Sequence, residues 1–434
     1  MSKVKDPSLS KKGAAELEWA RRNMPALASI RKRFEKEKPF AGLTIATALH
    51  LEKKTGILLE TLAAGGAKVF ASSCNPLTTD DSVAAVLAAG GSIEAFAWAG
   101  QTNEEYYFCL NSVLDAKPDI VIDDGCDLIN ILHTSRKSLL PRVKGACEET
   151  TTGITRLQAM QKAGKLLLPV FAVNNAYSKF LLDNQFGTAQ SAVTAIMQAT
   201  NKLVAGKTVV VAGYGWCGRG IASRMKAMGA NVIVVEIDGT LGPHESGLQR
   251  GLSALYDGYR VMDMDAAAAQ GDIFVTATGN KNVLDSEHFK LMKDGAILCN
   301  AGHFNVEINE PALRKMSKKT EELKDNVMGY TLSASGKAPS QEKTLYLLSE
   351  GRLVNLARPS GQGHPIEIMD GSFAVQVLCC ELLAKAKKMP AGVHGVPKDV
   401  DDSVARLLLN TQGIRLKEPT AEQKKYAESF DEGT

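Results

Sequence analysis

Short apolar runs alternate with longer amphipathic segments along most of the chain. Five runs rich in β-branched or aromatic residues have the length of buried strands, at 43–48, 69–71, 93–98, 120–122 and 166–173. Three intervening segments have the apolar spacing of helices, at 57–64, 81–89 and 104–114. This alternation predicts an α/β fold with a parallel sheet, in which ligands bind beyond the carboxyl ends of the strands.

A second series of apolar runs begins near residue 207 and carries a recognisable motif. A strand at 209–211 is followed by Gly213, Gly215 and Gly218, then by a helix at 221–228 and a strand at 232–235 that ends in Glu236. This order is the dinucleotide-binding fingerprint. Its glycines allow a tight turn, close approach of a pyrophosphate to the helix N-terminus and close packing of helix on strand. Glu236 would accept hydrogen bonds from the adenosine ribose, which favours NAD over NADP.

Polar residues stand just beyond many of the predicted strands. In the first half of the chain they are His50, Asn75, Asp124 and the segment around Glu149. After the fingerprint, strands at 273–276, 296–299 and 353–354 end in small and amide residues, among them Thr278, Asn300 and Asn355. Small and amide side chains at strand ends suit a nicotinamide pocket, so we expect both halves of the chain to contribute to one site.

Two further features have an ordinary structural interpretation beside a functional one. The hydroxyl-rich turn at 148–153 precedes a predicted helix, and its threonines could simply cap that helix. Lys179 and Asp183 lie four residues apart and share a face if helical, as surface ion pairs commonly do.

Composition narrows the class of protein. The 434 residues, 44% hydrophobic and 23% charged, exceed what one core supports, so at least two domains are expected. The formal net charge of +3 gives no reason to expect a nucleic-acid or membrane partner. The eight cysteines contain no C-x-x-C pair and no Cys/His cluster with zinc spacing, so we expect reduced thiols and no metal site. The polar N-terminus and the lack of long apolar stretches lead us to expect a cytoplasmic protein.

Nine short segments together resemble the S-adenosyl-L-homocysteine hydrolase family and occur in family order. They are SSCN at 72–75, DDG at 123–125, EETTTG at 148–153, DN at 183–184, VAGYG at 211–215, GHF at 302–304, VEI at 306–308, GRLVN at 351–355 and GHP at 363–365. The resemblance implies reversible hydrolysis of S-adenosyl-L-homocysteine to adenosine and L-homocysteine. One tightly bound NAD in each protomer takes a hydride from the ribose 3′ carbon, C4′ loses a proton, homocysteine leaves C5′, water adds, and the hydride returns.

The resemblance also implies roles for individual residues. Lys179 beside Asp183 would be the base for the 3′ hydroxyl, because burial readily lowers the pKa of a lysine. Asp124 would serve the C4′ proton, and His50 and His303 would serve water and the leaving group at C5′. The remaining implied substrate contacts are Glu52, Lys54, Asn75, Glu149, Thr150, Asn174, Asn184 and His364. The implied cofactor contacts are Thr150, Thr151, Thr152, Asn184, Gly213, Gly215, Gly218, Glu236, Thr278, Asn300 and Asn355.

Several positions depart from the common family pattern. Glu52 and Lys54 replace a Thr and a Glu near the purine edge, which makes hypoxanthine, and hence S-inosyl-L-homocysteine, an alternative to adenine. Thr188 replaces a common cysteine, so we assign no thiol role there. The loop at 358–362 looks longer than usual, and the C-terminal tail is short, so it is open whether Lys424, Lys425 and Tyr426 reach a neighbouring cofactor.

The expected architecture is a Rossmann NAD-binding domain at 186–354 inserted into a substrate domain at 1–185 and 355–390. Residues 391–434 would form a helical C-terminal oligomerisation segment of a homotetramer, and crossings near Asn184 and Asn355 would act as hinges. Two rival hypotheses are an NAD-dependent 2-hydroxyacid dehydrogenase, which would release NADH, and a non-catalytic nucleoside- or NAD-binding regulator.

Overall fold

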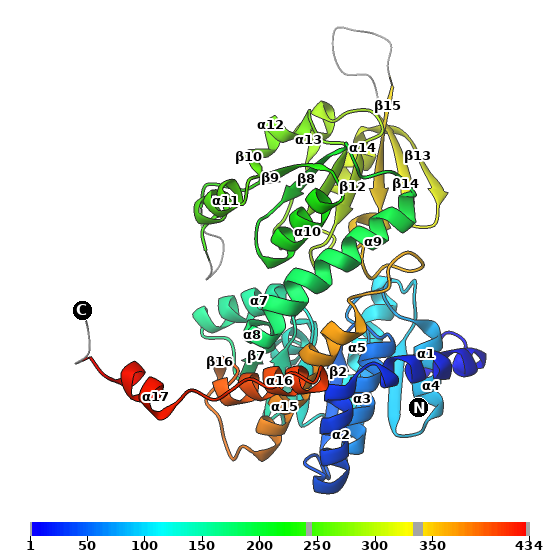
Figure 1. Ribbon diagram of the computed structural model, residues 1–434. Helices are drawn as coiled ribbons and strands as arrows, with labels where there is room; N and C mark the ends of the chain where they lie inside the picture. Colours follow the sequence, from blue (N-terminus) through cyan, green and yellow to red (C-terminus); the bar gives the residue numbers. More distant parts are fainter. Residues whose placement is uncertain (1, 240–244, 333–341, 431–434) are drawn as a thin grey trace.

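The protein has two lobes, each built around a β-sheet. The structure, a computed structural model, describes residues 2–239, 245–332 and 342–430. Figure 1 shows the lobe formed by residues up to about 185 and from about 365 below, and the lobe formed by the middle of the chain above. Within the described ranges each lobe contains one eight-stranded sheet. The expected α/β fold is therefore confirmed.

The lower sheet is parallel throughout. Its strands lie in the order β1 (Lys3–Val4), β4 (Ile93–Ala97), β3 (Lys68–Ser72), β2 (Thr44–Ala48), β5 (Ile120–Asp123), β6 (Gly145–Glu148), β7 (Pro169–Ala172) and β16 (Gly392–His394). The order reverses between β2 and β5, which creates a topological switch point where ligands of such sheets bind. His50 and Asp124 follow these two strands.

Helices cover both faces of the lower sheet and exclude water from its apolar side chains. One face carries α1 (Ser10–Arg22), α2 (Pro25–Glu37), α3 (Lys53–Ala64), α4 (Asp81–Ala89), α15 (Ile366–Lys385) and α16 (Lys398–Thr411). The other face carries α5 (Asn103–Asp115), α6 (Asp127–His133) and α7 (Thr151–Lys162). Burial on both faces explains why the strands are nearly continuous apolar runs.

The upper sheet has the strand order of a dinucleotide-binding fold. Its parallel strands are β10 (Arg260–Met262), β9 (Asn231–Val235), β8 (Thr208–Ala212), β11 (Ile273–Thr276), β12 (Ile297–Asn300) and β15 (Lys343–Leu348). Numbered along the chain, this is the order 3-2-1-4-5-6. Helices α9 (Thr188–Thr200), α10 (Trp216–Ala227) and α11 (Gly247–Tyr256) pack on one face, and α12 (Met264–Ala268), α13 (Ser286–Leu291) and α14 (Glu310–Met316) on the other.

Three details differ from the sequence interpretation. The upper sheet continues into the antiparallel strands β13 (Ser317–Lys324) and β14 (Val327–Leu332), which the apolar pattern did not reveal because β13 is largely polar and exposed. Residues 392–394, expected to belong to a helical C-terminal segment, form the strand β16 beside β7. The expected strand at 353–354 is wrong: Leu353 makes one isolated bridge with Asn300 and then turns.

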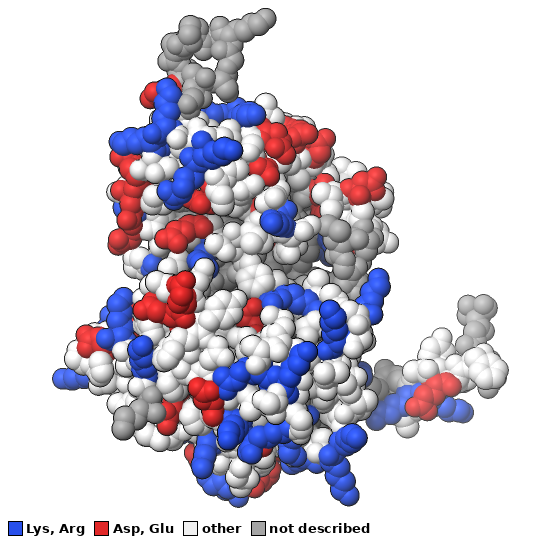
Figure 2. Space-filling model, turned by 180° about the vertical axis from the view of Figure 1, so that it is seen from behind, with Lys and Arg blue, Asp and Glu red and all other residues white. Residues whose placement is uncertain are grey.

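Two segments cross between the lobes. The first is the π-helix η4 (Phe180–Gly187), which continues directly into α9, the long helix between the lobes in Figure 1. The second is the loop from residue 352 to 365 that leads back to α15. Helix α16 packs on α15 and α2 of the lower lobe. Beyond it, α17 (Ala421–Glu428) has no buried residue and stands away from the body in Figures 1 and 2.

Figure 2 shows one face of the molecule. On this face the upper lobe carries charges of both signs, and Lys and Arg predominate on the lower lobe. Ion pairs of the lower lobe include the contacts of Arg21 and Arg31 with Glu60. None of the helices in the described ranges is long and apolar enough to cross a membrane.

Candidate active site

One cavity of about 1280 Å³ lies where the carboxyl ends of the two sheets face each other. Its lining includes most of the residues singled out in the sequence: His50, Glu52, Lys54, Asp124, Glu149, Thr150, Thr151, Thr152, Asn174, Lys179, Asp183, Asn184, Gly213, Gly215, Glu236, Thr278, His303, Asn355 and His364. Asn75, Gly218 and Asn300 lie outside this lining. Residues from both lobes therefore converge on one space.

Lys179 is at the centre of a buried polar cluster. Its Nζ donates to Asn184 Oδ1 at 2.8 Å and to Asn174 Oδ1 at 3.2 Å. The same Nζ lies 3.5 Å from Asp183 Oδ1 and 3.6 Å from Glu149 Oε1. The π-helical winding that follows Lys179 aligns residues five apart, which brings Asn184 onto its face. Since Lys179 is only 4% exposed, the pair with Asp183 is no surface ion pair.

The electrostatic environment of Lys179 differs from the sequence expectation. Burial acts to lower the pKa of Lys179, but the negative charges of Asp183, Glu149 and Asp124 outweigh it, so its pKa is raised. The expected lowering of the pKa is therefore wrong for this form of the protein. The sequence could not reveal this because the three carboxylates come from three different strands and helices.

Helix α15 supplies partners for this cluster that sequence reasoning missed. Ser372 donates to Asp183 Oδ2 at 2.7 Å, and Gln376 donates to Glu149 Oε2 at 2.5 Å. Burial raises the pKa of Asp183, but Lys179 and His364 outweigh it and leave that pKa lowered. Burial also raises the pKa of Glu149, even against Lys179, and its Oε1 has no hydrogen-bond partner. The only sequence signal for Ser372 and Gln376 was their place on an apolar helix.

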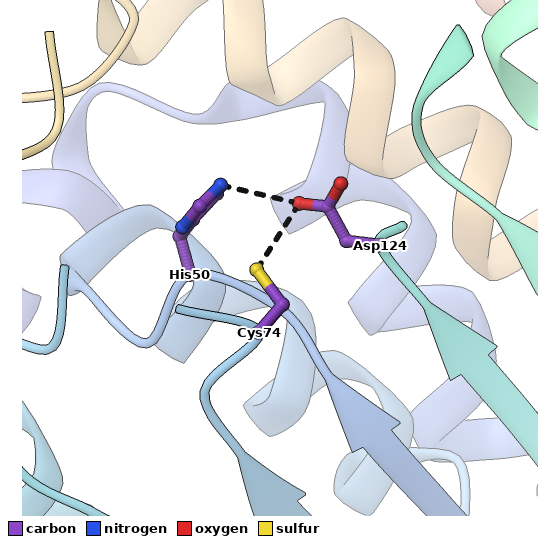
Figure 3. Close-up of side chains that lie close together, drawn as sticks. All are labelled: His50, Cys74 and Asp124. Carbon is purple, nitrogen blue, oxygen red and sulfur yellow. Dashed lines mark hydrogen bonds and ion pairs between the residues drawn. The ribbon is translucent and has the colours of Figure 1, made fainter. Parts of the chain in front are cut away.

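Three side chains of the lower sheet and one of the upper lobe form a second cluster. His50 Nε2 lies 3.4 Å and Cys74 Sγ 3.5 Å from Asp124 Oδ2. Figure 3 shows that these three side chains point toward one another. His303 Nδ1 of the upper lobe lies 3.5 Å from the other oxygen, Asp124 Oδ1. Burial lowers the pKa of His50 to about 4, which leaves the imidazole neutral at pH 7.

Glu52 and Lys54 form a buried pair in the lining of the same cavity. Glu52 caps α3 by accepting from the backbone N–H groups of Lys54 and Thr55. Lys54 Nζ lies 3.1 Å from Glu52 Oε2 and donates to the backbone carbonyl of Gln362 at 2.9 Å. Burial lowers the pKa of Lys54, although Glu52 acts in the opposite direction. His364 follows this loop, and its Nδ1 lies 3.0 Å from Asp183 Oδ1.

The glycine turn after β8 fits a dinucleotide. Gly213 has a φ of +95°, and a Cβ on Gly218 would lie 1.8 Å from the carbonyl oxygen of Gly213. A Cβ on Gly215 would meet nothing within 4 Å, so open space lies in front of it. No side chain caps the N-terminus of α10, which leaves its N–H groups free for an anion. The arrangement suits a pyrophosphate.

Other residues complete the cofactor side of the cavity. Glu236 at the end of β9 accepts from Tyr214 N at 2.6 Å and from Arg250 Nε at 2.7 Å. Thr278 is held by Glu307, which accepts from its N–H and hydroxyl groups; Glu307 is a further organising residue that sequence reasoning did not assign. Asn355 donates to Ser191, and its buried Oδ1 has no partner. An amide oxygen in that state can accept from a carboxamide.

Three of the residues expected to contact a ligand make contacts with other parts of the protein. Asn300 donates to the carbonyls of Gly302, Phe304 and Gly351 and accepts from Gly302 N, so it shapes the turn after β12. Asn75 Oδ1 accepts from Leu77 N. Gly218 acts through close packing. Their direct contacts with a ligand stay predictions. Thr188 Oγ1 lies 3.6 Å from Cys217 Sγ, so α10 brings a thiol close to the position where we assigned none.

Comparison with known proteins places this architecture in a family. The model of the S-adenosyl-L-homocysteine hydrolase NAD-binding domain matches residues 184–361, and the model of S-adenosyl-L-homocysteine hydrolase matches residues 1–141. The chain belongs to the S-adenosyl-L-homocysteine hydrolase family. The resemblance seen in the sequence is thereby confirmed, as is NAD as the cofactor of residues 184–361.

Relatives similar over their full length carry two different names. An S-inosyl-L-homocysteine hydrolase of Methanopyrus kandleri is 52% identical over 99% of this chain and 98% of its own. An adenosylhomocysteinase of Pyrococcus abyssi is 50% identical over 99% of this chain and 98% of its own. Among solved structures, a D-lactate dehydrogenase from Aquifex aeolicus has 15% identity and a TM-score of 0.32 over 51% of this chain and 66% of that one, a likeness too distant to bear on function.

Proposed function

We propose that this protein catalyses the reversible, NAD-dependent hydrolysis of a purine nucleoside thioether of L-homocysteine, giving the nucleoside and L-homocysteine. One observation carries the proposal: the buried Lys179 cluster shares a single cavity with the dinucleotide-binding turn at Gly213 and Gly215. The names of the relatives support the same reaction. A 2-hydroxyacid dehydrogenase would have no use for the Glu149 and Asn174 contacts around Lys179.

Bound NAD supplies a hydride acceptor for the ribose 3′ carbon and returns the hydride at the end of the reaction. We assign Lys179 to the proton of the 3′ hydroxyl. Because its pKa is raised, Lys179 must first lose a proton, and Glu149 Oε1 at 3.6 Å is the nearest carboxylate oxygen without a hydrogen-bond partner. The raised pKa of Glu149 suits it to hold that proton. Asn174 and Asn184 keep the ammonium group oriented.

The second cluster fits the chemistry at C4′ and C5′. Oxidation at the 3′ carbon acidifies the C4′ proton, and we assign Asp124 to accept it. His50 and His303 flank Asp124 at 3.4 and 3.5 Å, where they can give a proton to the departing thiolate and take one from the entering water. Because its pKa is lowered, His50 is neutral at pH 7 and has a nitrogen lone pair free to accept a proton.

The purine edge of the cavity favours hypoxanthine over adenine, and we propose S-inosyl-L-homocysteine as the preferred substrate. Hypoxanthine presents an oxygen acceptor beside an N–H donor, whereas adenine presents an amino donor beside a nitrogen acceptor. Lys54 can donate to the oxygen of hypoxanthine, and the neighbouring Glu52 can accept from its N–H group. In addition, Lys54 already occupies the Gln362 carbonyl that could otherwise accept from an adenine amino group.

The test is release of the nucleoside from S-adenosyl-L-homocysteine and S-inosyl-L-homocysteine by the purified protein without added NAD. Many turnovers are expected, because the cofactor is regenerated in each cycle. No product from either substrate, even with NAD supplied, would refute the proposed reaction. Faster turnover of S-adenosyl-L-homocysteine would refute the purine preference alone.

Substitution of Lys54 separates the purine contact from the chemistry. Lys54→Met should lower kcat/KM for S-inosyl-L-homocysteine at least about tenfold, the effect of one lost hydrogen bond to a buried polar group, with a smaller effect on S-adenosyl-L-homocysteine. Lys53→Met is the matched control, since Lys53 pairs with Glu16 instead. Equal losses on both substrates would contradict the assignment.

We further propose a Rossmann domain at 186–354 and a substrate domain at 1–185 and 355–390, assembled as a cytoplasmic homotetramer. The C-terminal segment at 391–434 divides in two: β16 and α16 pack on the substrate domain, so we assign only the residues beyond 411 to association with further copies. The described part of the C-terminal segment ends at residue 430. Its exposed Tyr426 and Phe430, and the exposed apolar stripe of Leu248, Leu252 and Leu255 on α11, support association with further copies. The eight free cysteines, seven of them buried, are in keeping with a reducing compartment.

A further inference from the structure

Three side chains of unlike chemistry converge at the carboxyl ends of three neighbouring strands, as Figure 3 shows. His50 follows β2, Cys74 follows β3 and Asp124 follows β5. One ligand atom of each, His50 Nε2, Cys74 Sγ and a carboxylate oxygen of Asp124, lies within 4.8 Å of the other two. Over residues 2–239, 245–332 and 342–430, no other group of three or more His, Cys, Asp or Glu side chains brings its ligand atoms this close together.

The separations match those around a tetrahedral metal ion. Zinc bonds of about 2.0 Å to nitrogen or oxygen and about 2.3 Å to sulfur, at tetrahedral angles, place neighbouring ligand atoms about 3.3–3.6 Å apart. The distances to Asp124 Oδ2 are 3.4 Å from His50 Nε2 and 3.5 Å from Cys74 Sγ. Little movement is therefore needed to bind an ion. Thiolate with imidazole selects zinc-like ions over magnesium or calcium.

Hydrogen bonds around the cluster hold two ligands in a suitable state. Thr78 Oγ1 donates to the Asn75 carbonyl, so its lone pairs face His50 Nδ1 at 2.8 Å. This places the imidazole proton on Nδ1 and leaves the Nε2 lone pair directed at the cluster, as outer-sphere partners of metal-binding histidines do. The Cys74 backbone is fixed by the hydroxyl of Tyr106, which donates to its carbonyl at 3.1 Å.

We propose that His50, Cys74 and Asp124 form a binding site for Zn²⁺ and chemically similar divalent ions, and that occupation of this site inhibits the enzyme. The Cys74 S–H bond breaks, a metal–sulfur bond forms, and the proton leaves to solvent without any change of oxidation state. The inhibitory part rests on the proposed function, because it follows from the withdrawal of His50 and Asp124 from catalysis. His303 lies 3.5 Å from the other oxygen, Asp124 Oδ1, and stands outside this group.

Cobalt provides a readout that does not depend on activity. The holoenzyme, freed of metal with a chelator, is titrated with Co²⁺, and thiolate ligation produces a charge-transfer band in the near ultraviolet. We expect one equivalent per chain, and Zn²⁺ should abolish the band by displacement. Absence of a thiolate band in the wild-type protein would overturn the proposal.

Substitutions of single residues identify the side chains that bind the metal ion. Cys74→Ser should lose the band, whereas Cys217→Ser should retain it, since Cys217 lines the same cavity but lies outside the cluster. Asp124→Asn should retain the band with affinity at least about tenfold weaker. The Asp124 variant keeps the test decisive if Cys74→Ser fails to fold. A band that persists in Cys74→Ser, or unchanged affinity in Asp124→Asn, would overturn the assignment.

The inhibitory consequence is tested on turnover. Nucleoside formation is followed by chromatography, because released homocysteine itself binds zinc. Zn²⁺ should inhibit the wild-type enzyme reversibly, with activity restored by chelator, and Cys74→Ser should need at least about tenfold more Zn²⁺. Undiminished turnover at saturating Zn²⁺ would overturn the inhibitory role. A protein without turnover but with the cobalt band would fail the proposed function and still confirm the metal site.

Discussion

At the scale of single residues, this protein keeps opposite charges buried side by side. Lys179 is surrounded by Asp183, Glu149 and Asp124, and their combined field exceeds the effect of burial on its pKa. A lysine in such a site is an ammonium group until a neighbour takes its proton. The mechanism therefore depends on how charge is shared within the cluster, and less on the intrinsic basicity of Lys179.

Removal of the Lys179 amine should separate cofactor binding from oxidation. In Lys179→Ala, NAD should stay bound, but its reduction on addition of adenosine or inosine should slow by at least about 10²-fold, because the 3′ hydroxyl loses its base. Absorbance of the reduced nicotinamide measures this step. Lys179→Arg, which keeps the charge but cannot give up its proton, should be equally impaired. Normal reduction in either variant would contradict the base assignment.

The lowered pKa of His50 makes stability depend on pH. With a pKa of about 4 in the folded protein and 6.5 as the ordinary value, the unfolded chain binds more protons between these pH values. The free energy of unfolding should therefore rise with pH from 4 to 6.5, and His50 contributes about 3 kcal/mol to that rise. Between pH 7 and pH 4, the wild-type protein should lose about that much more stability than His50→Gln in urea unfolding. Parallel losses would show that His50 has an ordinary pKa.

At the scale of elements, two short segments determine which atoms meet. The π-helix η4 places Asn184 on the face of Lys179, and the turn between β8 and α10 leaves a helix N-terminus uncapped. Both segments depart from regular geometry at the site, and regular strands and helices support them on either side. Such irregular elements are common at functional sites.

Substitution of two glycines of the fingerprint should affect different properties, stability in one case and NAD affinity in the other. Gly218→Ala would place a Cβ 1.8 Å from the Gly213 carbonyl oxygen, which forces helix and strand apart and should cost about 1–3 kcal/mol of stability. Gly215→Ala meets open space, so its melting temperature without cofactor should stay close to wild type while NAD affinity falls. Calorimetry with and without NAD distinguishes the two effects. A melting temperature lowered equally in both variants would contradict this division of roles.

At the scale of the whole molecule, function arises from two sheets whose switch points face each other. The lower sheet presents His50 and Asp124 between β2 and β5, and the upper sheet presents Gly213 and Thr278 between β8 and β11. Over the residues that the structure describes, only two segments cross between the lobes, so the expected hinges near Asn184 and Asn355 would need few changes of backbone to open or close the cavity.

The residues beyond 413, here called the C-terminal arm, include α17 and should serve assembly while contributing little to the fold of one chain. Helix α17 has no buried residue, so a chain ending at residue 413 should keep its secondary structure and its monomer fold. If the arm binds another copy, the truncated protein should form smaller oligomers in light scattering than the full chain. An unchanged oligomer would show that the arm is dispensable for assembly.

The sequence alone determined the α/β class and the cofactor turn, and most of the residues that it singled out line the cavity. These features depend on local patterns, since strand periodicity and the glycine spacing at 213, 215 and 218 follow from geometry within one segment. Tertiary structure decided the features that depend on distant segments: β16 beside β7, Ser372 and Gln376 behind the carboxylates, the raised pKa of Lys179, and the meeting of His50, Cys74 and Asp124. Each of these depends on the separation of side chains from different elements, and sequence spacing does not encode that separation.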